Sequence, residues 1–198
     1  AGCRMGCRFC ASTIGGLKRN LTPGEIAGQI LAAQRETGQR ISHVVVMGTG
    51  EPFDNYENLA KFLHIIHDPN GLNLSMRNIT VSTCGLVPMI ARFAEDFPQV
   101  NLAISLHAVS NEMRDEIMPV NKAYPMETLL SACRDYTQKT ARRVTFEYTL
   151  VKGVNDSAEY ARKLAARLQG MLCHVNLIPL NKVEETGYDT SERGAVLR

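Results

Sequence analysis

Apolar residues follow two spacings along this chain, one typical of short buried strands and one typical of amphipathic helices. Five segments are short, apolar and rich in β-branched residues: His43–Met47, Asn78–Ser82, Asn101–Leu106, Arg143–Leu150 and His174–Ile178. Helical spacing lies between them, over Asn55–His67, Val87–Phe97, Asn111–Met118, Pro125–Lys139 and Ser157–Leu168. Strands that alternate with helices need crossover connections, so the pattern predicts an α/β fold with a parallel sheet.

Two architectures satisfy this alternation, a partial β/α barrel and an open, doubly wound sheet. In both, ligands bind at the carboxyl ends of the strands. The loops at those ends are Gly48–Pro52, Ser82–Gly85, Ser105–His107, Gly153–Asp156 and Pro179–Asn181. We therefore expect the functional site to be built from these loops.

The first predicted helix begins with a capping pattern. Thr22 can cap the helix, Pro23 suits its first position, and Glu25 stands where a capping box places its carboxylate. We expect this helix to run to about Thr37, and a second capped helix to begin at Thr190. The cysteine-rich loop that opens the chain has no strand before it, so we expect a first strand to be missing and the chain to be truncated at both ends.

The composition favours one globular domain over residues 1–198. Of these residues 44% are hydrophobic and 21% charged, which suits a single core. No apolar run approaches the roughly 20 residues that cross a bilayer, and the start lacks the layout of a secretory signal. We expect a cytoplasmic monomer without membrane contact.

Positive charge gathers at the start of the chain. Residues 1–40 carry six Lys or Arg against Glu25 and Glu36, which gives six minus two, or +4, within a net charge of +2. A basic segment attracts phosphates, but a solvated charged surface is the commoner explanation. Charge by itself does not identify a nucleic acid as the partner.

Three cysteines form the sharpest motif, Cys3-x3-Cys7-x2-Cys10. Thiolates select zinc or iron–sulfur clusters, and a structural zinc site or an electron-transfer cluster takes four ligands. A cuboidal cluster on three cysteines leaves one iron open for chemistry, so a cluster and a zinc site both remain open at this point. The scattered Cys84, Cys133 and Cys173 are expected to be small buried hydrophobes, with Cys84 the least secure because it lies beside a strand-end loop.

The strand-end loops also carry polar candidates. In Gly48–Pro52 the glycines allow close backbone approach to a ligand, and Glu51 can accept hydrogen bonds from an ammonium, although a tight turn explains the same residues. The loop lacks the third glycine of a dinucleotide-binding motif and the lysine of a P-loop, so neither phosphate-binding motif applies. Ser82, Ser105 and Asn181 can bind a carboxylate or ribose, or can bond their own backbone. His107 is either a proton carrier or a structural residue.

Together these motifs resemble the radical S-adenosylmethionine superfamily, and within it the RlmN family of RNA adenine-carbon-2 methyltransferases. The first likeness rests on the three cysteines with Phe9 before the last. The second rests on Gly48-Thr-Gly-Glu-Pro52-Phe-Asp-Asn, Val81-Ser-Thr-Cys-Gly85, Ala103-Ile-Ser-Leu-His107, Met118-Pro-Val-Asn-Lys-Ala-Tyr-Pro125, Gly153-Val-Asn-Asp156 and Asn176-Leu-Ile-Pro-Leu-Asn181. The resemblance covers nearly the whole chain.

The resemblance implies a partial six-stranded, TIM-like β/α barrel whose first strand is absent here. It implies that Cys3, Cys7 and Cys10 hold a [4Fe–4S] cluster, whose open iron binds S-adenosylmethionine and cleaves it to a 5′-deoxyadenosyl radical. By motif, the S-adenosylmethionine contacts are Gly50, Glu51, Ser82, Ser105, Leu106, His107 and Asn181. The implied partners are 23S ribosomal RNA, transfer RNA and an electron donor such as flavodoxin.

In the RlmN family a cysteine near the C-terminus carries the methyl group and an upstream cysteine resolves the RNA adduct. Neither position is matched here, and the small N-terminal domain of the family is missing too, so we expect no catalytic cysteine within these residues and no completed methyl transfer by them. Two alternatives stay open. One is the related adenine-carbon-8 methyltransferase that confers antibiotic resistance, which Pro52 argues against; the other is a zinc-stabilised binding module without catalysis.

Overall fold

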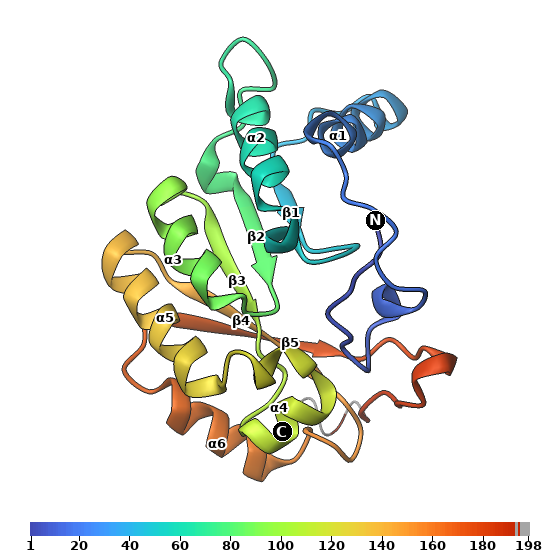
Figure 1. Ribbon diagram of the computed structural model, residues 1–198, viewed down its shortest axis with the longest axis vertical. Helices are drawn as coiled ribbons and strands as arrows, with labels where there is room; N and C mark the ends of the chain where they lie inside the picture. Colours follow the sequence, from blue (N-terminus) through green and yellow to red (C-terminus); the bar gives the residue numbers. More distant parts are fainter. Residues whose placement is uncertain (193, 195–198) are drawn as a thin grey trace.

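Five parallel strands alternate with helices in the computed structural model, which describes residues 1–192 and 194 (Figure 1). The strands are β1 Val44–Val46, β2 Ile79–Thr83, β3 Asn101–Ser105, β4 Val144–Leu150 and β5 Cys173–Pro179. The helices are α1 Pro23–Thr37, α2 Tyr56–His67, α3 Val87–Asp96, α4 Asn111–Ile117, α5 Met126–Thr140 and α6 Ala158–Leu168. The predicted strands and the helices between them are confirmed, with ends within one residue of those expected.

The strands stand side by side in chain order, β1-β2-β3-β4-β5, all parallel. Val81 pairs with Leu102, and Ile104 pairs with Phe146. A doubly wound sheet reverses its strand order at a switch point, whereas this order never reverses. Right-handed crossovers in one direction send each connecting helix to the same face of the sheet. The order therefore selects the partial barrel and excludes the open sheet.

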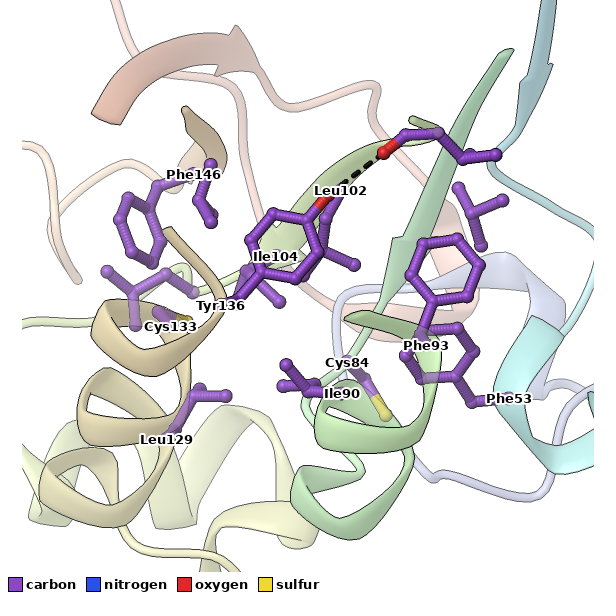
Figure 2. Close-up of a cluster of buried hydrophobic side chains, with 14 of the residues drawn as sticks. Phe53, Cys84, Ile90, Phe93, Leu102, Ile104, Leu129, Cys133, Tyr136 and Phe146 are labelled. Carbon is purple, nitrogen blue, oxygen red and sulfur yellow. Dashed lines mark hydrogen bonds between the residues drawn. The ribbon is translucent and has the colours of Figure 1, made fainter. Parts of the chain in front are cut away.

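One face of the sheet is apolar and packs against α3 and α5 (Figure 2). Leu102 and Ile104 point from β3 toward Phe93 of α3 and Tyr136 of α5, and all four are at most 1% exposed. The Tyr136 hydroxyl donates a hydrogen bond of 2.9 Å to the Val100 carbonyl just before β3. This packing fixes the sheet from its helical side.

The opposite face of the sheet is polar, because side chains alternate across a strand. It carries Thr80 and Ser82 on β2, Ser105 on β3, and Thr145, Glu147 and Thr149 on β4. The Glu147 carboxylate is buried and accepts a 2.7 Å hydrogen bond from the Asn176 amide on β5. Figure 1 shows the N-terminal loop, in dark blue, on the side of the sheet away from α3 and α5. A polar, loop-covered face is suited to binding a ligand.

The ends of the chain were less predictable than its middle. The capping box of α1 is confirmed, since Thr22 and Glu25 exchange both hydrogen bonds. Thr190, expected to cap a helix, instead bridges to Val151, and most of that expected helix falls outside the described residues. No helix in the described part of the chain has the length and apolar character needed to cross a membrane.

Candidate functional site

The cysteine loop meets the carboxyl ends of β1, β2 and β3 around a cavity of about 160 Å³. Its lining includes eight of the residues that the sequence singled out: Cys3, Cys7, Cys10, Gly50, Glu51, Ser82, Ser105 and His107. These residues come from four separate segments, and the parallel sheet brings them together because all its carboxyl ends share one edge. A second cavity of about 270 Å³ lies against the same Gly48–Pro52 loop and also includes Cys3.

Hydrogen bonds and one close backbone approach hold the cysteine loop in place. The Arg8 amide donates to the Ile117 carbonyl of α4 over 2.9 Å, and the Thr13 hydroxyl donates to the Cys10 carbonyl over 2.9 Å. Gly50 has a φ of +125°, and a Cβ on it would stand 2.8 Å from the Gly2 carbonyl oxygen. Only glycine fits this close approach. The loop is thus anchored to α4 and to the loop after β1.

The chemistry of the three thiols fits an iron–sulfur cluster. Burial and the neighbouring cysteines raise the pKa of Cys7 to about 12, and burial raises that of Cys3, so a bound metal must displace their protons. Thiolates are soft ligands that select zinc or an iron–sulfur cluster, so these three residues fit the cluster that the resemblance implies.

Glu51 links two strand ends. One carboxylate oxygen accepts from the Phe53 amide over 3.0 Å, and the other accepts from the Cys84 amide over 2.7 Å. Burial raises the pKa of the Glu51 carboxyl, and these two hydrogen bonds oppose the rise. A carboxylate has about four acceptor positions, so Glu51 can hold the loop and still accept from a ligand at the cavity.

His107 is a buried, neutral imidazole. Its Nδ1 accepts a 2.9 Å hydrogen bond from the Thr149 amide, so Nε2 carries the proton. Burial, together with the charge of Arg114, lowers the pKa of His107 to about 3. Its ring meets Phe9 of the cysteine loop edge to face at 4.9 Å between centroids. At neutral pH His107 can donate a hydrogen bond to a ligand but cannot supply a positive charge.

Two predicted contacts lie apart from the cavity lining. The Leu106 side chain is fully buried in the core, so only the backbone of Leu106 is left to contact a ligand at the cavity. Asn181 follows β5, is exposed, and lines neither cavity described above. Of the other cysteines, Cys84 lines the cavity, whereas Cys133 lies in the core and Cys173 is half-buried on β5.

Sequence reasoning assigned no role to two buried polar side chains that hold the strand ends. The Asn155 amide donates to the carbonyls of His107 and Thr149 over 2.8 Å each, and its oxygen accepts from the Val151 amide over 2.7 Å. Its place in a Gly-Val-Asn-Asp turn after a strand was a usable signal. Arg114 gave no signal, because a charged residue on a short polar helix is expected to face solvent.

Comparison with known proteins agrees with this geometry. The model of the Radical SAM superfamily matches residues 1–165. The chain is similar to two proteins named "Probable dual-specificity RNA methyltransferase RlmN". The one from Clostridium novyi is 56% identical over 96% of this chain and 56% of its own length. The one from Clostridioides difficile is 55% identical over 100% of this chain and 57% of its own length. A solved radical SAM methyltransferase from Sphaerobacter thermophilus matches with a TM-score of 0.95 and 48% identity, over 99% of this chain and 58% of that one. The chain thus spans a little over half the length of these proteins.

Removing the donor of Asn155 tests how the ends of β3 and β4 are held. We expect Asn155→Asp to lower the free energy of unfolding by about 3 kcal/mol, since two buried carbonyls lose their donor and meet a carboxylate. Urea denaturation measures the change, and Asn70→Asp on the surface is the matched control. A loss no larger than that of the control would show that Asn155 holds nothing in place.

The buried imidazole predicts a pH dependence of stability. The folded-state pKa of His107 is about 3 and its unfolded value is roughly 6.5, so the unfolded chain binds a proton that the folded chain refuses. The neutral imidazole therefore contributes fully to the free energy of unfolding above about pH 6.5. That contribution falls by about 1.4 kcal/mol for each pH unit below this value. His107→Asn keeps an acceptor and tolerates the φ of 54°. Its denaturation midpoints should depend less on pH than those of the wild type, whereas the exposed His174→Asn should match the wild type.

Proposed function

The chain belongs to the Radical SAM superfamily, and we propose that it forms the cofactor-binding core of an RNA methyltransferase that modifies carbon 2 of adenine. The observation that carries the proposal is the single cavity shared by three cysteines and by polar groups from three strand ends. Members of the superfamily use a [4Fe–4S] cluster and S-adenosylmethionine. In this proposal Cys3, Cys7 and Cys10 hold the cluster.

The cavity offers suitable partners for S-adenosylmethionine. A cluster held by Cys3, Cys7 and Cys10 would bind S-adenosylmethionine at the cavity and would supply the electron for its reductive cleavage. Glu51 is the acceptor for the N–H groups of the ligand's amino nitrogen, while the hydroxyls of Ser82 and Ser105 and Nε2–H of His107 face the remaining polar groups. Asn181, exposed after β5, remains a predicted contact.

The RNA substrate is proposed from similarity and from charge. Relatives at 55–56% identity are named as dual-specificity RNA methyltransferases, which supports 23S ribosomal RNA and transfer RNA as substrates and the cytoplasm as the location. Arg8 and Lys18 are exposed on the N-terminal segment and take part in no ion pair among the described residues. Cations beside the cavity suit the RNA backbone.

Cluster assembly is the first test. After anaerobic reconstitution with iron and sulfide, we expect about four irons per chain and an EPR signal of the reduced cluster that changes when S-adenosylmethionine is added. Cys7→Ala should abolish both, whereas Cys173→Ala, which removes a thiol away from the cavity, should leave both intact. A folded chain that takes up stoichiometric zinc instead of iron would sink the proposal and favour the binding module.

The position of methylation is the second test. RNA treated with the intact protein that contains this chain, then digested and analysed by mass spectrometry, should yield 2-methyladenine. The 8-methyl isomer would identify the antibiotic-resistance relative instead. Residues 1–198 by themselves should cleave S-adenosylmethionine without methylating RNA, since Cys84, Cys133 and Cys173 match neither catalytic cysteine of the family; methylated adenine from them would contradict this expectation.

A further inference from the structure

Arg114 is the largest fully buried side chain among the described residues, with 0% of its surface exposed. Its guanidinium lies under the carboxyl ends of β2 and β3. Nη2 donates to the Cys84 carbonyl over 2.7 Å and to the Ser105 carbonyl over 3.1 Å, and Nε donates to the Leu106 carbonyl over 3.2 Å. Arg114 therefore ties together two of the strand ends that line the cavity.

All the hydrogen-bond acceptors of Arg114 are neutral. The fourth is the Asn121 side-chain oxygen, 3.2 Å from Nη1. The Asp115 carboxylate is one side chain further away, where it accepts from the Asn121 amide over 2.7 Å. Burial lowers the pKa of Arg114, but a guanidinium remains protonated in proteins. Burying a cation without a direct anionic partner is strongly unfavourable, so a counter-charge nearby is to be expected.

A cluster held by the three cysteines would supply that counter-charge. Arg114 Nη2 donates to the carbonyls of Cys84 and Ser105, and both residues line the same cavity as the three cysteines. His107, also near Arg114, is neutral, and it brings no competing charge. Three thiolates on a cluster core of charge 2+ leave one net negative charge, and one added electron makes it two. A fixed cation therefore stabilises the reduced cluster more than the oxidised one.

We propose that Arg114 is a positioning residue whose buried charge raises the reduction potential of the cluster held by Cys3, Cys7 and Cys10. The inference rests on the proposed function, because it requires that cluster. The step concerned is the transfer of one electron from a low-potential donor, such as a reduced flavin protein, to the cluster, with no bond made or broken. In the same position, the guanidinium fixes the backbone of Cys84 and Ser105 at the cofactor cavity.

A redox titration followed by EPR on the reconstituted protein separates charge from hydrogen bonding. Arg114→Gln removes the charge and should lower the equilibrium constant for reduction about tenfold, which for one electron is a midpoint about 59 mV more negative. Arg114→Lys keeps the charge with fewer hydrogen bonds and should stay near the wild type. Arg162→Gln, which removes an exposed arginine of α6, should not change the midpoint.

A second variant tests the charge while Arg114 itself stays in place. The double change Asp115→Asn and Asn121→Asp conserves net charge and moves the carboxylate one side chain closer to Arg114, whose own hydrogen bonds are kept. It should also lower the midpoint. Equal shifts in Arg114→Lys and Arg114→Gln, or no shift in the double variant, would overturn the inference and leave the proposed function standing. A folded wild type that takes up no cluster would overturn both.

Discussion

Parallel pairing of the strands in unbroken chain order is the constraint on which this structure depends. It gathers the carboxyl ends of β1 to β5 on one edge, and right-handed crossovers send the connecting helices to one face. The other face is left to the loops, including the cysteine loop before α1. Residues far apart in sequence, such as Cys7 and Ser105, line one cavity because the strand ends lie side by side under the cysteine loop.

Backbone pairing by itself does not hold the strand ends together, because the ladder stops where the loops begin. Buried side chains take over at this edge. Glu51 joins the loop after β1 to the end of β2, Arg114 joins β2 to β3, and Asn155 joins β3 to β4. Each bonds backbone groups, so each satisfies polar atoms that would otherwise be buried without partners. Neighbouring strand ends at the cavity are therefore joined through these side chains.

The same side chains set the electrostatics of the cavity. Burial keeps His107 neutral, and Arg114 is the buried cation at the strand ends. Burial also raises the pKa of Glu51, against the two amide hydrogen bonds that its carboxylate accepts. The N-terminal segment adds exposed cations outside. An anionic cluster and a cationic sulfonium ligand both find an opposite charge in such a site. The backbone fold matches that of a radical SAM methyltransferase with a TM-score of 0.95 over 58% of that protein.

The sequence by itself determined the elements of this fold and singled out eight of the residues that line the cavity. Period-two and helical spacing located the strands and the helices between them, and loops after strands identified Glu51, Ser82 and His107, because these signals are local in the chain. Tertiary structure decided what depends on distant contacts. The strand order is that of a partial barrel, the Leu106 side chain lies in the core and not in the cavity, and Arg114 is buried beneath the cavity. The environment of a side chain depends on segments that no local pattern brings together, so the partners of Arg114 and the neutrality of His107 appeared only in the folded chain.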